Sequence, residues 1–384
     1  MKAVRYHKPK DVRVDEVDDP RIEHERDIVL KVTSTAICGS DLHIYNGLVP
    51  QLREMTLGHE FMGIVEEVGP AVTNLKVGDR VVVPFPMADG TCWYCTHGLP
   101  TACENSNRLH GPEGNIVKGK GGGIFGYTDL YGGKDGGQAE KVRVPFGDYG
   151  PRVVPPGLKD EQVLFLTDVI PTAWHAVKWG GVKEGETVAV FGAGPIGLMA
   201  ARIAKLWGAS KVIVADVQDY RLDMARRLTG AITVNADEQD PDDFVRSETE
   251  GRGADVCIDA VGMEADRNIL EKASAVVHMQ RGTMKVVRHC FGAVRRGGRV
   301  SIVGVYATPF DNFPLGQFFD KGLNMRGGQA NVHEVVDDLM GLVRDGKLRA
   351  DDIITHTLPL EEAPHGYDIF NRKEDGCVKV VLKP

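Results

Sequence analysis

The chain has 384 residues, enough for two domains, and its 42% hydrophobic and 26% charged residues are typical of a soluble globular protein. A formal net charge of −8 argues against nucleic acid as the main partner. Because no apolar run approaches the ~20 residues of a membrane span and residues 1–14 lack the apolar core of a secretion signal, the sequence predicts a cytoplasmic protein with no membrane partner.

The first part of the chain, residues 1–160, is predicted to be mostly β. Short apolar stretches alternate there with turn residues, a pattern typical of antiparallel strands that curve or close into a barrel. The stretches with this pattern are 27–38, 61–69, 77–85 and 139–146. The glycine-rich stretch 119–140 is predicted to be a long irregular surface loop.

Residues 161–330 show a different pattern, in which buried strands alternate with amphipathic helices. Strands are predicted at 187–194, 211–217, 254–262 and 298–306, and helices at 197–209 and 220–231. This alternation predicts a parallel, doubly wound sheet, and hence an α/β fold. Residues 331–384 add a helix and a last strand, 377–384, which is predicted to return to the first domain.

A glycine motif follows the first strand of the second domain. Gly192, Gly194 and Gly197 form G-x-G-x-x-G, with Pro195 and Ile196 between the last two glycines. The motif ends a strand and opens a helix, the context in which it indicates a dinucleotide site. The first glycine allows a tight turn, the second lets a pyrophosphate approach the backbone, and the third lets helix and strand pack closely. A purely structural turn is the alternative.

The predicted cofactor is NAD. Asp216 ends the next strand, nineteen residues after Gly197, where a carboxylate accepts hydrogen bonds from the adenosine ribose and repels a 2′-phosphate. Arg221, five residues further on, is a candidate to contact the adenine or the ribose, or to soften the preference for NAD.

Two groups of residues have the chemistry of metal ligands. Cys38 lies in a short segment with Ser40, Asp41 and His43, and the pair His59–Glu60 precedes a strand. Three of the seven cysteines, Cys92, Cys95 and Cys103, lie within twelve residues. An odd, clustered set of cysteines suits metal-bound thiolates in a reducing compartment better than disulfides. Each group alone is also common in proteins without a metal.

Together with the glycine motif, these residues resemble the zinc-dependent medium-chain alcohol dehydrogenases over nearly the whole chain. The resemblance implies a GroES-like catalytic domain over residues 1–160, joined by 331–384, and a Rossmann domain over 161–330. It also implies that Cys38 and His59 bind a catalytic zinc. The third ligand position of the family falls on Asp168, as in the glutathione-independent formaldehyde dehydrogenases. Capping of a helix is the alternative role for Asp168.

The second cysteine group resembles the structural zinc lobe of the family, which has four cysteines. Cys92, Cys95 and Cys103 match the last three ligands, and Asp89 stands at the first. A carboxylate can bind zinc at ~2.0–2.2 Å, so a site of one aspartate and three cysteines is reasonable. His97 is a nearby alternative donor, and a metal-free lobe is the alternative reading. The expected content is two zinc ions per chain.

The resemblance also assigns roles in the reaction. Ser40 is expected to take the substrate's proton and pass it through the cofactor ribose to His43 near solvent, although His43 could instead be structural. Asp41 is expected to orient His59, and Glu60 to approach the metal during ligand exchange.

Further residues are expected at the cofactor. Thr172 is expected beside the nicotinamide, and backbone groups of Val303 and Val305 at its carboxamide. Lys379 is a candidate for the pyrophosphate. The segment 263–290 is longer than in ordinary relatives and either covers the adenine end of the cofactor or forms a surface helix pair.

The predicted function is NAD-dependent hydride transfer to or from a small alcohol or aldehyde hydrate. Within the family, the alternatives are a polyol or threonine dehydrogenase and an aldehyde dismutase with tightly held NAD. A zinc-free quinone-type reductase fits less well because Cys38, His59 and Asp168 are all present. A non-enzymatic nucleotide sensor fits less well because the relay residues Ser40 and His43 are present. A homo-oligomer is expected, with a tetramer favoured over a dimer.

Overall fold

The computed structural model describes residues 1–107, 121–264, 283–306 and 313–384, and these form two compact units. Unit 1 is Met1–Pro171 with Asn331–Pro384, and unit 2 is Thr172–Ala330. None of the helices in the described ranges has the length and apolar character that a membrane crossing requires. Most of the segment 263–290, predicted either to cover the adenine end of the cofactor or to form a surface helix pair, lies outside the described residues.

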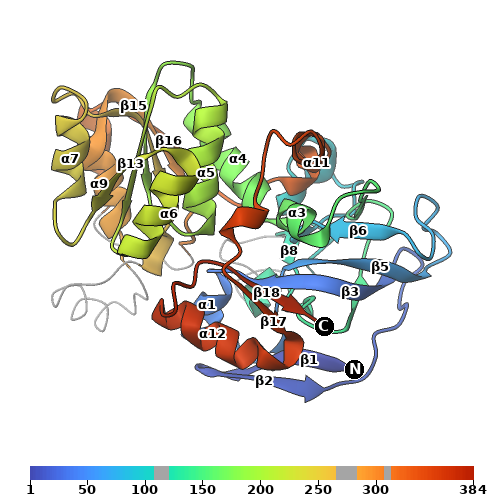
Figure 1. Ribbon diagram of the computed structural model, residues 1–384. Helices are drawn as coiled ribbons and strands as arrows, with labels where there is room; N and C mark the ends of the chain where they lie inside the picture. Colours follow the sequence, from blue (N-terminus) through green and yellow to red (C-terminus); the bar gives the residue numbers. More distant parts are fainter. Residues whose placement is uncertain (108–120, 265–282, 307–312) are drawn as a thin grey trace. The chain divides into compact units, whose positions relative to one another are not determined.

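Unit 1 is built around a seven-stranded sheet with the order β10-β6-β5-β3-β18-β17, in which β9 also pairs with β3. The central strand β3 (Ile28–Ile37) pairs antiparallel with β5 (Glu60–Val68) and with β18 (Val380–Lys383), the last strand of the chain (Figure 1). In this register Ala36 lies opposite Glu60. Cys38 directly follows β3 and His59 directly precedes β5, so both residues lie at the same end of this strand pair.

Short strands and helices complete unit 1. Its other strands are β1 (Lys2–Lys8), β2 (Asp11–Glu16), β4 (Met55–Thr56), β6 (Arg80–Val83), β7 (Pro86–Met87), β8 (Gly123–Ile124), β9 (Lys141–Val144), β10 (Arg152–Val153) and β17 (His356–Pro359). Its α-helices are α1 (Asp41–Tyr45), α2 (Trp93–Thr96), α3 (Asp160–Val163), α11 (Val336–Arg344) and α12 (Ala363–Arg372). Its 3-10 helices are η1 (Pro100–Ala102), η3 (Asp129–Tyr131), η4 (Leu164–Thr167), η6 (Val332–Glu334), η7 (Asp351–Ile353) and η8 (Leu360–Glu362).

A large cluster of aliphatic and aromatic side chains packs on one face of this sheet. It includes Ile28, Leu30, Val32, Phe61, Val65, Val81, Val83, Phe125, Val142 and Val144. β-branched and aromatic residues fit the pleated surface of a sheet, which is why the apolar stretches of the sequence form strands here.

The glycine-rich stretch, predicted to be a surface loop, is largely buried where the structure describes it. Residues 122–128 and 136–139 are buried, and Phe125 packs edge-on against Phe61 at a centroid distance of 5.2 Å. A Cβ on Gly126 would lie 2.4 Å from the backbone nitrogen of Gly58. The glycines thus allow close backbone packing, and the prediction of a surface loop is wrong for these residues. Residues 119 and 120 lie outside the described ranges.

Unit 2 is a six-stranded parallel sheet with the order β13-β12-β11-β14-β15-β16. The strands are β11 (Thr187–Phe191), β12 (Lys211–Asp216), β13 (Ile232–Asn235), β14 (Ala254–Asp259), β15 (Val294–Ile302) and β16 (Asn324–Gly327). The helices are α5 (Pro195–Leu206), α6 (Asp219–Thr229), α7 (Pro241–Ser247), α9 (Lys285–Ala293) and α10 (Leu315–Asp320), together with the 3-10 helix η5 (Gly262–Glu264). The helix α4 (Val169–Gly180) spans the boundary between the units.

Helices cover both faces of this sheet, with α5 and α6 on one side and α7 and α9 on the other (Figure 1). The strand order reverses direction between β11 and β14, so the carboxyl ends of these two strands flank the crevice where a ligand binds in such sheets. The predicted fold class, a doubly wound parallel sheet with a mostly β second part, is confirmed.

Candidate metal centres and cofactor site

Three buried side chains from separate parts of unit 1 meet at one point. Cys38 follows β3, His59 directly precedes β5, and Asp168 lies between η4 and α4. Cys38 Sγ lies 3.6 Å from Asp168 Oδ2, and His59 Nε2 lies 3.5 Å from the same oxygen. Glu60 belongs to the same group, whose ligand atoms all lie within 4.8 Å of one another. The structure therefore brings together the three residues predicted to hold a catalytic zinc.

These separations fit a tetrahedral metal ion. Zinc bonds of ~2.0–2.3 Å place tetrahedral ligand atoms about 3.3 to 3.8 Å apart. Burial raises the pKa of the Cys38 thiol to about 11, so a thiolate at this position needs a cation beside it. Glu60 Oε2 is buried and has no hydrogen-bond partner among the described residues. The donor set of Cys38, His59 and Asp168 thus fits zinc, with Glu60 close to the same point.

A buried polar network lies on the Nδ1 side of the His59 ring. His59 Nδ1 lies 3.1 Å from Asp41 Oδ1, although the two groups are not aligned for a strong hydrogen bond. Asp41 Oδ2 accepts from the Cys38 backbone at 3.0 Å and from Gln138 Nε2 at 3.2 Å. Gln138 Oε1 in turn accepts from the Tyr367 hydroxyl at 2.9 Å. A carboxylate behind a metal-binding histidine fixes the ring and its tautomer, and Asp41 lies where this role requires.

The predicted relay residues lie beside the cluster. Ser40 Oγ is 3.3 Å from Cys38 Sγ and 3.2 Å from His59 Nε2. His43 Nδ1 is 3.2 Å from the Tyr127 hydroxyl, and the Tyr127 ring stands edge-on to His59 at 6.0 Å. His43 was expected near solvent, but it is 3% exposed, and burial lowers its pKa to about 4. Its ring is therefore neutral at pH 7, held against Tyr127 instead of facing water.

The contacts of Lys379 differ from the contact with the pyrophosphate that was predicted for it. Its side chain is fully buried, and its ammonium contacts Glu60 Oε1 at 2.5 Å and the Ile37 carbonyl at 3.0 Å. Burial acts to lower the pKa of Lys379, but the nearby Glu60 carboxylate outweighs it and raises that pKa. The ammonium thus balances the charge of Glu60 inside unit 1. This placement gives no support to a contact between Lys379 and the cofactor pyrophosphate.

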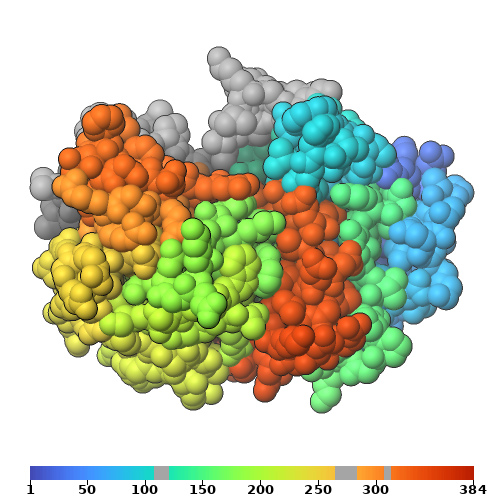
Figure 2. Space-filling model, turned by 90° about the horizontal axis from the view of Figure 1, so that it is seen from above, coloured from blue at the N-terminus to red at the C-terminus, as the bar shows by residue number. Residues whose placement is uncertain are grey.

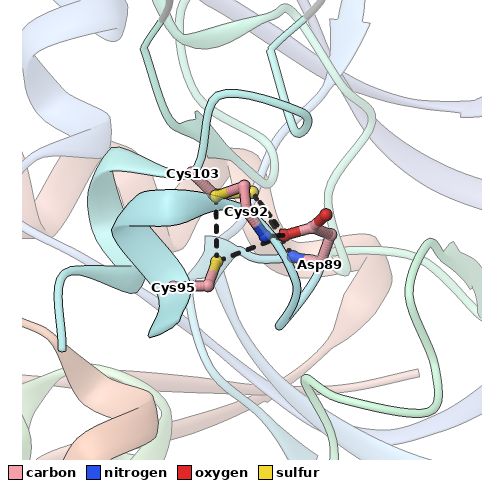
Figure 3. Close-up of side chains that lie close together, drawn as sticks. All are labelled: Asp89, Cys92, Cys95 and Cys103. Atoms are coloured by element: carbon pink, nitrogen blue, oxygen red, sulfur yellow. Dashed lines mark hydrogen bonds between the residues drawn. The ribbon is translucent and has the colours of Figure 1, made fainter. Parts of the chain in front are cut away.

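The second candidate metal centre gathers Asp89, Cys92, Cys95 and Cys103 around a small space (Figure 3). Cys92 and Cys95 sulfurs lie 3.5 Å apart, and Asp89 Oδ1 lies 3.3 Å from Cys95 Sγ and 3.4 Å from Cys103 Sγ. All four side chains are buried. These separations are again those of tetrahedral zinc ligands. His97 is not part of the group, because its ring stacks on Trp93 at 4.1 Å.

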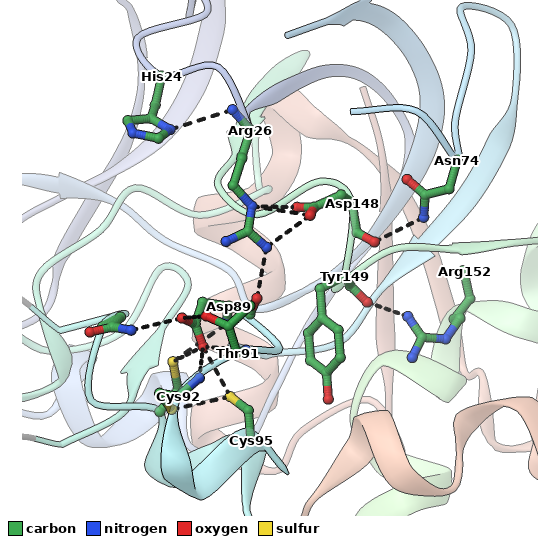
Figure 4. Close-up of polar contacts among 12 residues, drawn as sticks. His24, Arg26, Asn74, Asp89, Thr91, Cys92, Cys95, Asp148, Tyr149 and Arg152 are labelled. Atoms are coloured by element: carbon green, nitrogen blue, oxygen red, sulfur yellow. Dashed lines mark hydrogen bonds and ion pairs between the residues drawn. The ribbon is translucent and has the colours of Figure 1, made fainter. Parts of the chain in front are cut away.

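The two oxygens of Asp89 have different partners (Figure 4). Oδ1 faces the sulfurs and accepts from the backbone of Thr91 and Cys92, both at 3.1 Å. Oδ2 accepts from the Thr91 hydroxyl at 2.5 Å and from Asn105 Nδ2 at 2.7 Å. Burial acts to raise the pKa of Asp89, but these hydrogen bonds outweigh it and hold the pKa well below its usual range. Asp89 is therefore a charged carboxylate with one oxygen beside the three sulfurs.

An arginine fixes the backbone of this lobe. Arg26 donates to the Asp89 carbonyl at 2.7 Å and pairs with the Asp148 carboxylate at 2.8 Å (Figure 4). Its guanidinium also lies over the Phe146 ring, 5.1 Å from the centroid. The segment that carries the lobe (cyan, residues 89–103) forms part of the molecular surface in Figure 2. The lobe also has a small apolar cluster, in which Tyr94 and Tyr149 pack against Ala88 and the three cysteines, so both this cluster and the polar contacts of Arg26 stabilise it.

The glycine motif has the geometry of a dinucleotide site. Gly192 has φ of +101°, and a Cβ on Gly197 would lie 1.8 Å from the Gly192 carbonyl oxygen. A Cβ on Gly194 would meet nothing within 4 Å, so its backbone faces open space. Helix α5 begins directly after it with Pro195 and Ile196, and its amino-terminal N–H groups are oriented for phosphate oxygens.

Asp216 at the end of β12 holds this loop. Its Oδ2 accepts from the Ala193 backbone at 2.6 Å, and its Oδ1 accepts from Val217 and Gln218 at 2.8 and 2.9 Å. Arg221 lies beside Tyr220, with Nε 3.2 Å from the hydroxyl. Asp216 is thus a fixed carboxylate next to the glycine loop, at the place where the ribose of a dinucleotide lies.

The residues expected at the nicotinamide lie at two places in unit 2. Val303 and Val305 follow β15, and the Val303 backbone donates to the Asp259 carbonyl at 3.0 Å. The Val305 carbonyl accepts from the Met263 backbone at 3.1 Å. Thr172 is a partly buried residue of α4.

A third group of candidate metal ligands, Asp240, Asp242 and His289, lies in unit 2 and is partly exposed. Asp240 caps α7 by accepting from the backbone of residues 242 and 243, and His289 pairs with Asp242 at 2.9 Å. These contacts account for the side chains without a metal.

Sequence reasoning missed several residues that contact the two centres. Tyr127 and Gln138 lie in the glycine-rich stretch that was predicted to be a loop, and Thr91 and Asn105 carry no motif. A run of glycines next to single aromatic and amide residues was the available signal for the first two, because close backbone packing buries whatever lies between the glycines.

Comparison with known proteins agrees with this architecture. Residues 24–152 match the alcohol dehydrogenase GroES-like domain family, and residues 195–287 match the zinc-binding dehydrogenase family. The zinc-type alcohol dehydrogenase-like protein AdhB of Bacillus subtilis is 44% identical over 100% of both chains. The glutathione-independent formaldehyde dehydrogenase of Pseudomonas aeruginosa is 31% identical over 96% of this chain and 94% of its own.

Solved structures show the same fold over the whole chain. The alcohol dehydrogenase TADH from Thermus sp. ATN1 has a TM-score of 0.85 at 40% identity, covering 100% of this chain and 99% of its own. A zinc-binding dehydrogenase from Sinorhizobium meliloti 1021, bound to NADP, has a TM-score of 0.78 at 27% identity, with 100% and 99% coverage. An alcohol dehydrogenase from E. coli CFT073 in complex with NADH shares the fold at a TM-score of 0.80 and 24% identity, with 100% and 99% coverage.

Proposed function

Because this chain belongs to the zinc-type medium-chain alcohol dehydrogenase family, we propose that it transfers a hydride between NAD and a small alcohol or aldehyde hydrate. One observation carries the proposal. Cys38, His59 and Asp168 are buried together at the spacing of tetrahedral zinc ligands, in a chain whose second unit has the glycine loop and the acidic residue of a dinucleotide site.

The residues around the first centre divide the work of alcohol oxidation. Cys38, His59 and Asp168 would hold the zinc, which would supply a Lewis acid to lower the pKa of a substrate hydroxyl. Ser40 Oγ lies among the ligand atoms and can both accept and donate a proton, so it takes the hydroxyl proton. His43 is the next group of the proposed relay after the cofactor ribose, and its contact with Tyr127 orients the ring. Because burial lowers its pKa to about 4, His43 passes the proton on and does not retain it at pH 7.

The residues proposed to bind the cofactor belong to unit 2. Bound NAD supplies the hydride acceptor. Gly194 leaves the backbone open to the pyrophosphate, the α5 amino terminus faces its charge, and Asp216 accepts from the ribose hydroxyls. Thr172, Val303 and Val305 are proposed to contact the nicotinamide, and Arg221 the adenosine end.

The substrate class is proposed from the third ligand. Asp168 at this position resembles the formaldehyde dehydrogenase subgroup, one member of which is 31% identical to this chain. A substrate panel tests this proposal. We expect NADH formation with formaldehyde hydrate or a small primary alcohol. Faster turnover of a polyol or of threonine would replace this proposal by one of the alternatives. Conversion of formaldehyde to equal amounts of methanol and formate without added NAD would identify a dismutase.

The cofactor preference gives a second test. We expect NAD to be used at least ~10-fold more efficiently than NADP, because a carboxylate beside a 2′-phosphate costs more than ~1.4 kcal/mol. Asp216→Gly should narrow this ratio, measured as kcat/KM for the two cofactors. It should also lower the affinity for both cofactors, because the Ala193 N–H loses its hydrogen-bond acceptor. The matched control is Asp223→Ala, which removes an exposed carboxylate from α6 and should leave the ratio unchanged. Equal use of NAD and NADP by the wild type would contradict the assignment of Asp216.

Assembly and location follow the same proposal. We propose a homo-oligomer, with a tetramer favoured, in the cytoplasm. The edge strand β16, which includes Met325, is exposed along its length, and Leu315 and Phe319 of the preceding helix α10 are exposed as well, Phe319 at 86%. An unpaired edge with apolar side chains is a surface that proteins cover. The mass in solution, measured by light scattering, tests this against a monomer of 41.9 kDa.

A further inference from the structure

Asp259 is a fully buried carboxylate with an unusual number of partners. It ends β14, next to β11 and on the opposite side of β11 from β12. Its Oδ1 accepts from the backbone of Val261 and Gly262, both at 2.9 Å, and its Oδ2 accepts from the Tyr306 hydroxyl at 2.7 Å. Its carbonyl accepts from Val303 at 3.0 Å and from the next residue at 2.9 Å. One residue therefore binds two separate turns.

These two turns, 260–263 and 303–306, are packed backbone to backbone. The Met263 N–H donates to the Val305 carbonyl at 3.1 Å. A Cβ on Gly304 would lie 2.1 Å from the Gly262 nitrogen, and a Cβ on Gly262, where φ is +75°, would lie 2.5 Å from the Val305 nitrogen. With no side chain between them, the turns are held together by this backbone hydrogen bond and by the contacts of Asp259, which binds the first turn and the Tyr306 hydroxyl of the second.

The 260–263 turn also touches the glycine loop. The Ala260 N–H donates to the Phe191 carbonyl at 2.9 Å, and a Cβ on Gly192 would lie 2.7 Å from a methyl carbon of Val261. The order of contacts is thus glycine loop, 260–263 turn and 303–306 turn. Asp216, the residue for the adenosine ribose, lies on the β12 side of the glycine loop. A dinucleotide that spans the crevice puts its other half on the β14 and β15 side.

We propose that Asp259 and Tyr306 are positioning residues that hold the 303–306 turn for the nicotinamide half of the cofactor. This inference rests on the proposed function, because it needs a dinucleotide in unit 2. The hydride leaves or enters the nicotinamide ring. A small displacement of the 303–306 turn that contacts this ring therefore changes the reaction geometry. The Tyr306 phenol suits the task because its ring packs on the core of unit 2 while its hydroxyl donates to Asp259.

Tyr306→Phe tests the proposal, since it removes one hydroxyl and keeps the ring. Calorimetric titration should show NADH binding weakened at least ~5-fold, because a turn that has lost its contact with Asp259 must be ordered when the nicotinamide half binds. Binding of ADP-ribose, which lacks the nicotinamide, should stay unchanged because it uses the glycine loop and Asp216. The matched control Tyr6→Phe alters a buried tyrosine in β1 of unit 1 and should change neither affinity.

A coupling measurement covers the case in which Tyr306→Phe also lowers the melting temperature. If the two residues act through each other, their effects on NADH affinity should not add. The double variant, with both Asp259→Asn and Tyr306→Phe, should then bind NADH about as tightly as the weaker-binding of the two single variants. Equal weakening of NADH and ADP-ribose, or no change in either, would overturn the inference. A wild-type chain that binds neither NADH nor ADP-ribose would instead overturn the proposed function itself.

Discussion

Replacing Asp168 by alanine is expected to remove about one zinc ion per chain and to lower kcat at least ~10³-fold, the equivalent of about 4 kcal/mol in the barrier. Asp168 Oδ2 lies 3.6 Å from Cys38 Sγ and 3.5 Å from His59 Nε2, so its loss leaves two ligands for the ion. NADH affinity should stay nearly unchanged, because the glycine loop and Asp216 belong to unit 2. Zinc by mass spectrometry and kcat on the same preparation measure this effect.

The control for this change is Asp19→Ala, which removes a half-exposed carboxylate of the same unit that pairs with Lys141. It should keep both zinc content and kcat. Full activity of Asp168→Ala would remove Asp168 from the metal site and leave capping of α4 as its role.

Removing the carboxylate of Asp89 should destabilise the second lobe without stopping the chemistry. Asp89→Ala takes away one of four ligands and the acceptor of Thr91 and Asn105. We expect the melting temperature to fall by at least ~5 °C and zinc to leave faster to a chelator, because a closed zinc site contributes its binding energy to folding. The initial rate per folded chain should change little.

Two further variants sharpen this test. Asp89→Cys should retain zinc through four thiolates yet remain below the wild-type melting temperature, because Thr91 and Asn105 lose their acceptor. Asp345→Ala, an exposed carboxylate of unit 1, should change neither stability nor zinc content. A wild type with one zinc per chain, together with an unchanged Asp89→Ala variant, would show that the lobe holds no metal.

Local patterns predicted the cofactor unit well. The glycine loop could be recognised because each glycine has a role that depends on neighbours close in sequence, such as the 1.8 Å approach of a Gly197 Cβ to the Gly192 carbonyl. Buried parallel strands also have continuous apolar sequences. The edge strand β16 was missed because all four of its residues are exposed and carry no apolar pattern.

The metal ligands could be predicted only through the family resemblance. Cys38 and Asp168 are 130 positions apart, and nothing local to either residue shows that they meet. The antiparallel register of β3 and β5 explains the meeting of Cys38 and His59, but a register of this kind is a tertiary property.

Buried charge was the hardest feature to predict. From the sequence, Lys379 was predicted to be a cation that contacts a phosphate, yet its buried ammonium pairs with Glu60. His43 reads as a histidine near water, yet Tyr127 from the glycine-rich stretch covers it. In both cases the partner comes from a distant segment, and a pattern in one stretch of sequence does not reveal which polar groups pair inside a core.

Hydride transfer by the wild-type chain, before and after removal of its metal, tests the central claim most directly. The sample as purified should contain two zinc ions per chain and form NADH from NAD and a small alcohol or aldehyde hydrate. Removal of zinc from the Cys38, His59 and Asp168 centre by a chelator should abolish NADH formation, and added zinc should restore it. NADH formation that continues at full rate in a chain without zinc would contradict the account.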